Sequence, residues 1–306
     1  MKITTINLFQ FCNPRYSYYS KKEKFTIDEW NKKILWLKMK LKNLNSDIIA
    51  FQEVFCDDIL EDLCKSCGYE YFATVDKAFL DKNIYKTCIV TVASKHKFID
   101  ISTPSISKDF EFSRKPIKVK IKIENKELLI YNVHLKSNRL NEFEHKFTIN
   151  NTFKEKYEKN YTNIKNKTSA LHQRFREIIH LSSDINKNLK ENKNIIVLGD
   201  FNDKLHSFCL DALKSKDYLN DIINDNKIKD DYKFELKDAF DLTNLKKRKY
   251  TSYFMSEGNI IDFILVSENI KNIKSYEVDD YHLKDNKNGS LLNSDHAIVS
   301  CDIELK

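Results

Sequence analysis

The chain has 306 residues, is 41% hydrophobic, and carries a formal net charge of +7 from 52 basic and 45 acidic side chains. A chain of this size can bury a large core, and we expect one domain over residues 1–306. Apolar runs such as Ile195–Leu198 are far shorter than the ~20 residues that span a bilayer. With no transmembrane segment and no export leader after Met1, we expect a cytoplasmic protein.

The net charge and the cysteines indicate which partners and which covalent or metal cross-links to expect. The mild basic excess favours anionic partners, of which nucleic acid is one of several candidates. Seven cysteines are spread along a chain without an export signal, so a disulfide framework is not expected. Cys64 and Cys67 have the spacing of half a zinc site, but no second pair accompanies them. We predict that both pack on a helix face beside Leu60 and Leu63.

The first quarter of the chain alternates strands and helices. Lys2–Leu8 alternates in polarity and predicts a strand. Thr26–Glu29 is a capping box, and apolar residues then recur every three or four positions through Ile27–Leu44, which indicates a helix. Ile48–Phe51 predicts a short buried strand, and Asp57–Cys67 a second helix.

The middle of the chain is typical of a sheet with one exposed face. Strands are predicted for Ile84–Ser94, Ile117–Ile123 and Glu127–His134, with a hairpin turn at residues 124–126. Residues 138–170 are polar, basic and aperiodic, and predict an inserted loop.

Strands and helices continue to interleave toward the end. Leu171–Leu189 indicates a second long helix, followed by the strand Asn194–Leu198. Asp211–Asn226 predicts a helix, and Asn259–Val266 and Ala297–Glu304 predict the last strands. Because no repeat or linker divides the chain, we expect an α/β fold with two sheets packed face to face and helices outside.

Polar residues stand at the ends of several predicted buried strands. A rigid strand end beside a loop is where a precise site is best built. An isolated Gly-Asp or Asp-His pair carries little information, but six such places are hard to attribute to surface decoration. They are Asn7, Glu53, His134, Asp200 with Asn202, Asp262, and Asp295 with His296.

The motifs around these residues are, in chain order, N-L, Q-E, N-x-H-L, G-D-F-N, I-D-F-I and S-D-H. This ordered set, spread over nearly the whole chain, resembles the endonuclease/exonuclease/phosphatase superfamily. That superfamily includes deoxyribonucleases, abasic-site endonucleases, neutral sphingomyelinases and inositol-polyphosphate phosphatases. The resemblance implies a four-layered α/β sandwich of two mixed sheets flanked by helices, and metal-dependent hydrolysis of phosphate esters.

A divalent cation is part of that implication. Phosphodiester hydrolysis needs an attacking water and a cation that neutralises the non-bridging oxygens. Magnesium, or manganese in its place, fits the oxygen ligands of Glu53 and Asn7. The resemblance implies that Glu53 is the main Mg²⁺ ligand, with Asn7 near the metal and Asp295 a further ligand. The alternatives are a surface carboxylate for Glu53 and a turn-capping role for Asn7.

The G-D-F-N motif and the N-x-H-L motif carry the expected catalytic groups. Asp200 and Asn202 alternate with Phe201, so in an extended segment both side chains point to one side. An Asx turn is the alternative. By resemblance, Asp200 orients or deprotonates the water and Asn202 stabilises the pentavalent state. His134 contacts the scissile phosphate by resemblance, although a histidine at a strand end can also be a core residue.

The remaining site residues are an acid–histidine pair and an arginine. By resemblance, Asp262 fixes the tautomer of His296. We expect His296 to act as general base, and phosphate stabilisation is the alternative. Arg114 matches a family position that contacts substrate phosphate, although an arginine on a loop is usually solvated.

Three further residues are weaker candidates for substrate contact, for which a solvated side chain is the equal alternative: Tyr85, Lys136 and Arg139. The basic balance and the lysine-rich insertion favour a nuclease acting on DNA or RNA. The alternatives are an enzyme for a phospholipid, inositol phosphate or small nucleotide, and a non-catalytic phosphate-ester-binding module. A positive surface that continues past the site suits a polymer, whereas an enclosed pocket suits a small ester.

Overall fold

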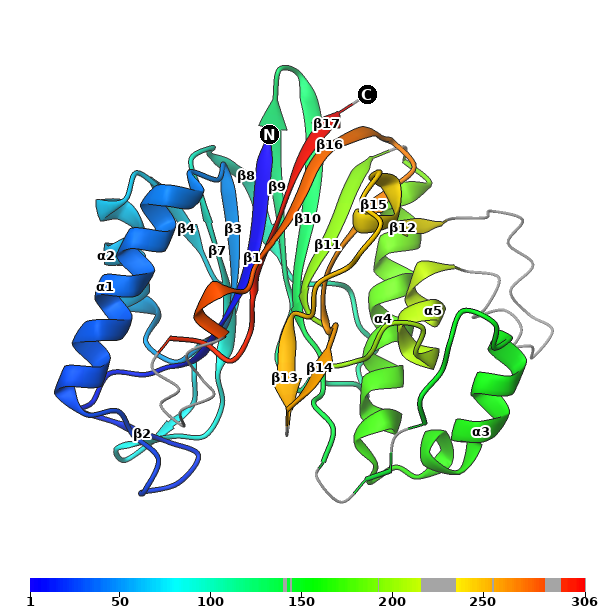
Figure 1. Cartoon of the computed structure of the whole chain (residues 1–306), viewed down its shortest axis with the longest axis horizontal. Helices are drawn as coiled ribbons and strands as arrows, with labels where there is room; N and C mark the ends of the chain where they lie inside the picture. The colour runs from blue at the N-terminus through cyan, green and yellow to red at the C-terminus, as the bar shows by residue number, and fades with distance from the viewer. Residues whose placement is uncertain are drawn as a thin grey trace.

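The computed structural model describes residues 1–139, 142–143, 145–191, 193–215, 235–254, 256–283 and 293–305. Two six-stranded sheets pack face to face, and helices cover their outer faces (Figure 1). The first sheet has the order β16 (Ile270–Asp279), β17 (Ile298–Leu305), β1 (Lys2–Phe11), β3 (Ile48–Val54), β7 (Ile89–Ser94) and β4 (Tyr71–Ala73). The second has the order β12 (Leu236–Asp238), β15 (Asp262–Ser267), β11 (Asn194–Asp200), β10 (Lys126–His134), β9 (Ile117–Ile123) and β8 (Phe98–Ser102).

Both sheets are mixed, as the predicted four-layered sandwich requires. β1 runs parallel to β3 and antiparallel to β17, while β10 runs parallel to β11 and antiparallel to β9. Two small sheets sit at the loop end, β2 (Ser17–Tyr18) with β6 (Ile84–Tyr85) and β5 (Leu80–Asp81), and the hairpin β13 (Ser252–Phe254) with β14 (Glu257–Asn259). A 3₁₀ turn, η1 (Phe240–Leu242), follows β12. The expected fold is confirmed.

Apolar side chains form three layers of core, one between the sheets and one under each set of helices. α1 (Ile27–Leu44) and α2 (Asp57–Ser66) cover the first sheet; α4 (Ala170–Leu189), α3 (Phe153–Lys165) and α5 (Phe208–Lys214) cover the second (Figure 1). The capping box predicted for α1 is present. Cys64 is buried in the core beneath α1 and α2, and Cys67 is partly buried against it. No helix in the described ranges is long and apolar enough to cross a membrane.

The predicted loop over residues 138–170 is wrong in its second half, where α3 lies. Thr152 caps this helix and Glu155 completes a capping box of the type that was recognised at Thr26. The helix is polar overall, yet it buries Phe153 and Ile164, with the lysine and asparagine between them covering the rest of that face. Its apolar stripe is too sparse to show a helical period, so the cap was the informative signal.

Three other boundaries differ from prediction. The strand expected over residues 84–94 is two strands, because Lys86 N donates to Phe79 O and turns the chain into the small sheet. The strand expected over 259–266 is likewise split between β14 and β15. The helix expected over 211–226 begins earlier, at the Ser207 cap, and ends at Lys214, because Ser215 is extended and pairs with Glu235. Residues 216–234 lie outside the described part.

Gly199 shows how tightly the second sheet is packed beside the polar strand ends. It pairs with Val133 across β10 and β11 and has φ of +137°. A Cβ atom at this position would lie 2.0 Å from Val133 O, which is a backbone atom that cannot swing aside. Only glycine, which has no Cβ, fits here.

We therefore expect Gly199→Ala to lower the free energy of unfolding by about 2 kcal/mol or more, through both backbone strain and overpacking. Gly68→Ala is the matched control, since Gly68 also has positive φ but no atom lies within 4 Å of its added Cβ. The control isolates the backbone cost of about 1 kcal/mol. Urea denaturation of both variants gives the comparison, and equal losses would contradict the packing argument.

Candidate active site

Three polar side chains stand in a row across the second sheet. His134 ends β10 and Asp200 ends β11, and the parallel register pairs these two residues directly. Asp262 begins β15, and the antiparallel register pairs it with Asp200. Neighbouring strands lie about 4.8 Å apart, so paired residues on one face bring their side chains together. Three motifs separated by many residues thus meet at one sheet edge.

A bulge in the first sheet supplies the next group. The β1–β3 register shifts after Asn7, and Phe9, Gln10 and Glu53 all have positive φ. In this conformation Gln10 N donates to Glu53 Oε2 at 2.9 Å, and Phe9 N donates to Asn7 Oδ1 at 3.0 Å. The bulge therefore fixes one oxygen of the Glu53 carboxylate with a backbone N–H, and the Asn7 side chain donates to the other oxygen at 3.4 Å.

The segment before β17 is tied to the same bulge. Ser294 Oγ donates to Asn7 O at 2.6 Å, and His296 N donates to Ser294 Oγ at 3.0 Å. Lys33, which is fully buried on α1, donates from Nζ to Phe9 O at 3.1 Å and also to Asn293 O. Sequence reasoning missed Lys33, although a lysine on the same apolar helix face as Trp30 is a detectable signal.

One carboxylate oxygen lies at the centre of these groups. Asp200 Oδ2 accepts from Asn7 Nδ2 at 2.9 Å and from Asn202 Nδ2 at 3.3 Å. It also lies 3.4 Å from His134 Nε2 and 3.8 Å from His296 Nε2. Burial raises the pKa of Asp200 to about 7, opposed by His296. The predicted residues of both sheets converge on this atom.

His296 and Asp262 form the expected pair. His296 Nδ1 lies 3.0 Å and 2.9 Å from the two oxygens of Asp262, which fixes the Nδ1–H tautomer and turns Nε2 toward Asp200. Burial opposes a charged imidazole, but the carboxylates of Asp262, Asp200 and Asp295 outweigh it and raise the pKa of His296 well above its usual value. The three carboxylates therefore favour the charged form of the His296 imidazole.

His134 has the opposite character. Burial lowers its pKa well below the usual value, with a further contribution from the charges of Arg114 and His296. Its Nδ1 is buried and has no hydrogen-bond partner among the described residues. These effects favour the neutral imidazole, whose Nε2 faces Asp200.

Asn202 and Arg114 are fixed by one carbonyl. Asn202 Nδ2 donates to Leu135 O at 3.1 Å, and Arg114 Nη1 donates to the same oxygen at 3.0 Å. Asn202 N also donates to Asp200 Oδ1 at 2.8 Å, so the segment after β11 folds back as an Asx turn and Asn202 takes positive φ. The predicted extended conformation of residues 200–202 is therefore wrong, yet both side chains still reach the same place.

These groups open into a cleft of about 740 Å³. Six predicted residues line it, namely Glu53, Arg114, Asp200, Asn202, Asp295 and His296. Asn7, His134 and Asp262 are buried behind the lining. Of the weaker candidates Arg139 lines the cleft, whereas Tyr85 and Lys136 are not among its lining residues. Tyr19, Lys204 and Tyr253 also line it, and no motif pointed to them.

Two sets of side chains could hold a cation. Asp200, Asp262 and His296 offer ligand atoms within 4.8 Å of one another, but Asp262 and His296 are already hydrogen-bonded to each other. Glu53 and Asp295 both line the cleft, and Asp295 Oδ1 is buried with no hydrogen-bond partner in the described ranges.

The second set offers carboxylate oxygens that line the open cleft. Partial burial raises the pKa of Asp295 to about 6, with Glu53 adding to the rise against the opposing charge of His296. Two carboxylates that repel each other at an open cleft match the oxygen ligands of Mg²⁺ or Mn²⁺. The amide oxygen of Asn7 is turned to Phe9 N, so Asn7 orients Glu53 and Asp200 through its nitrogen.

Several solved structures share this fold. An AP endonuclease from Archaeoglobus fulgidus superposes with a TM-score of 0.62 at 14% identity, covering 100% of both chains. The 3′–5′ exonuclease NExo from Neisseria meningitidis gives 0.60 at 14% identity, covering 99% of this chain and 100% of that one. The human Nocturnin catalytic domain gives 0.60 at 16% identity, covering 100% and 94%. At such identities the likeness shows the fold alone.

Sequence comparison gives the family directly. A comparison with curated proteins gave no match. The sequence model described as the Endonuclease/Exonuclease/phosphatase family matches residues 25–296, which is most of the chain. The fold agrees with that match, and the chain belongs to the endonuclease/exonuclease/phosphatase family, whose members are generally hydrolytic phosphoesterases.

Proposed function

We propose that the chain is a divalent-metal-dependent phosphodiesterase that cleaves nucleic acid, DNA or RNA, by attack of water on phosphorus. The observation that carries the proposal is the convergence on Asp200 Oδ2 of an amide and two imidazoles from both sheets. A buried carboxylate at the base of an open cleft, with one charged and one neutral histidine beside it, suits phosphoryl transfer. Because both sheets are needed, we propose that residues 1–306 act as one domain.

The roles follow from protonation. Asp200 accepts a proton from the attacking water, since its pKa of about 7 matches the operating pH. His296 keeps its proton on Nε2 and stabilises a non-bridging phosphate oxygen, which is the alternative to the general-base role. Asn202 and Arg114 donate to the other phosphate oxygens. The phosphorus–oxygen ester bond breaks as the new bond to water forms, and the leaving oxygen takes a proton from solvent.

A cation completes the charge balance. Glu53 and Asp295 would hold Mg²⁺, with Mn²⁺ as a substitute, and Asn7 would orient Glu53. The cation supplies neutralisation of the phosphate charge and polarisation of the ester. Bringing a phosphodiester to a cleft with two carboxylates would otherwise be opposed by repulsion.

A nucleic-acid substrate is favoured by the charge of the chain and by the openness of the site. The net charge is +7, and Arg114, Arg139 and Lys204 line the cleft around the carboxylates. The structural relatives include proteins named as an AP endonuclease and a 3′–5′ exonuclease. A phospholipid, inositol phosphate or small nucleotide is the competing substrate class, and a substrate panel separates them.

The catalytic assignment predicts that Asp200→Ala and His296→Ala each lower kcat on bis(p-nitrophenyl) phosphate by ~10² or more. His180→Ala is a matched control, because this histidine stacks on Phe110 away from the cleft. Steady-state kinetics with Mn²⁺ measures the effect. Turnover near the parental rate in either site variant would refute the assignment.

The metal assignment predicts that EDTA abolishes turnover and that Glu53→Gln weakens Mn²⁺ binding by ~10-fold or more. Asp262→Asn should bind Mn²⁺ within about twofold of the parental protein, because its carboxylate serves His296 instead. Isothermal titration of Mn²⁺ into each variant distinguishes the two candidate sets. The reverse order of affinities would place the cation between Asp200 and Asp262.

A further inference from the structure

A second hollow continues from the cleft past the proposed site. It has a volume of about 210 Å³ and shares Lys204, Glu257 and Asn259 with the cleft. We call this second hollow the flanking groove. Among the residues that line it but do not line the cleft are His145, Lys146, Phe147 and Tyr250. A surface that extends beyond the reacting phosphate has no use for a small ester, but it suits a polymer.

Exposed rings stand on one wall of the groove, at the hairpin of β13 and β14. Tyr253 is 47% exposed and lines the cleft, and Tyr250 is 49% exposed and lines the flanking groove. Their ring centroids lie 5.8 Å apart. A Cβ on Gly258 would lie 2.3 Å from the Tyr250 ring, so this ring rests on the hairpin backbone. Its position is therefore fixed by packing.

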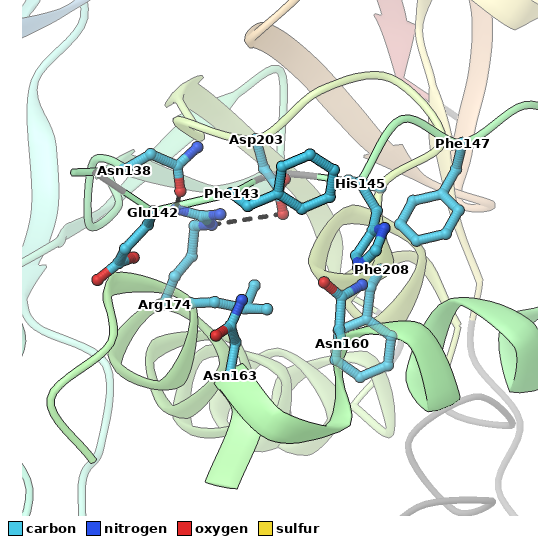
Figure 2. Close-up of a pocket in the computed structure, with 12 residues that line it drawn as sticks. Asn138, Glu142, Phe143, His145, Phe147, Asn160, Asn163, Arg174, Asp203 and Phe208 are labelled. Carbon is cyan, nitrogen blue, oxygen red and sulfur yellow. Dashed lines mark hydrogen bonds and ion pairs between the residues drawn. The ribbon is translucent and has the colours of Figure 1, made fainter. Parts of the chain in front are cut away.

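The other wall belongs to the segment before α3. Figure 2 shows Phe143 beside the Arg174–Asp203 ion pair, with His145 and Phe147 further along the same segment. The ring centroids are 4.9 Å apart for Phe143 and His145 and 6.0 Å apart for His145 and Phe147. His145 and Phe147 line the flanking groove, whereas Phe143, which is 73% exposed, is not part of the lining of the groove or of the cleft.

The charges of the groove are compatible with a phosphate backbone. Glu257 is paired with Lys146 at 2.6 Å, and Asp203 with buried Arg174 at 3.4 Å, so both acidic side chains of the lining are balanced by cations. Lys204 lies where the groove joins the cleft. Aromatic rings beside lysines are the combination that binds single strands, in which bases stack on rings while cations follow the backbone.

We propose that the flanking groove binds the bases next to the scissile phosphate of a single-stranded polynucleotide; this rests on the proposed function. The Lys146–Glu257 ion pair joins the two walls directly, so the groove is closed at this point to a bulky duplex unless the pair opens. A duplex also hides the faces of its bases, whereas a single strand exposes them for stacking. Both side chains of that ion pair are mostly exposed, so it costs little to open for a threading strand.

Direct binding tests the groove without turnover. Fluorescence anisotropy gives the Kd of a labelled single strand of about 12 nucleotides, and of the same strand in a duplex, using the Asp200→Ala protein with Mn²⁺. We expect the single strand to bind tighter. Tyr250→Ala and His145→Ala, each added to Asp200→Ala, should raise its Kd about tenfold. Equal or tighter binding of the duplex, or an unchanged Kd in both variants, would overturn the proposal.

Two controls guard against unfolding and against nonspecific loss. Tyr161→Ala removes an exposed tyrosine on α3 that lines no part of the groove or cleft, and it should leave the Kd unchanged. Tyr250→Phe keeps the ring and should restore binding if stacking is the cause. A Kd raised equally by Tyr250→Phe and Tyr250→Ala would contradict stacking at that position.

The test of the flanking groove and the test of the proposed phosphodiesterase activity can fail independently of each other. Hydrolysis of bis(p-nitrophenyl) phosphate by the parental protein tests catalysis and does not involve the groove. Hydrolysis without a single-strand preference refutes the groove and leaves the phosphodiesterase standing. Tight single-strand binding without hydrolysis refutes the phosphodiesterase and leaves the groove standing.

Discussion

The buried hydrogen bond from Asn7 Nδ2 to Asp200 Oδ2 joins the two sheets, and the proposed chemistry depends on it. A second buried hydrogen bond joins the same two sheets, in which Gln52 Nε2 donates to Asn132 Oδ1 at 2.6 Å. Polar groups buried between sheets must be paired, because an unsatisfied one costs about 1–3 kcal/mol. These few hydrogen bonds therefore fix the position of one sheet relative to the other, since the facing surfaces are otherwise apolar. The bond to Asp200 is one of them.

The need to hold buried polar groups in fixed positions explains why the central residues of the site lie on strands. His134, Asp200 and Asp262 take their spacing from the hydrogen-bond register of three neighbouring strands. Glu53 takes its orientation from a backbone N–H in the β1 bulge. The positive φ values of Phe9, Gln10 and Glu53 are held by the surrounding strand pairing, and such backbone strain is commonly found at pre-organised sites. Arg114 and Asn202 lie on loops, where Leu135 O fixes both, and Asp295 and His296 lie on the segment before β17.

The sequence predicted the structure correctly where a local pattern of residue types is enough to indicate an element or a site. The six polar strand ends, the α1 cap and the alternation of β9 all follow from local patterns, and the fold was predictable from them. The bulge at Phe9 was not, because positive φ in a non-glycine residue leaves no local signature. The position of Lys33 on the apolar face of α1 is a signal in the sequence, but its carbonyl partners could not be predicted because they come from distant segments. The exposed rings of Tyr250 and Tyr253 can be interpreted only once they are seen to line the groove and the cleft, which are tertiary features.

Asn7 and Glu53 belong to one layer and Asp200 to the other, so any ligand that rests on this seam is bound by the joined layers and not by either alone. Binding of the ligand and association of the two sheets are then thermodynamically linked. A ligand present at 100 times its Kd would stabilise the state with joined sheets by about 2.7 kcal/mol. The linkage is reciprocal. A substitution far away in the apolar interface, such as one at Ile130, would weaken ligand affinity by loosening the contact between the sheets, without touching a single ligating atom.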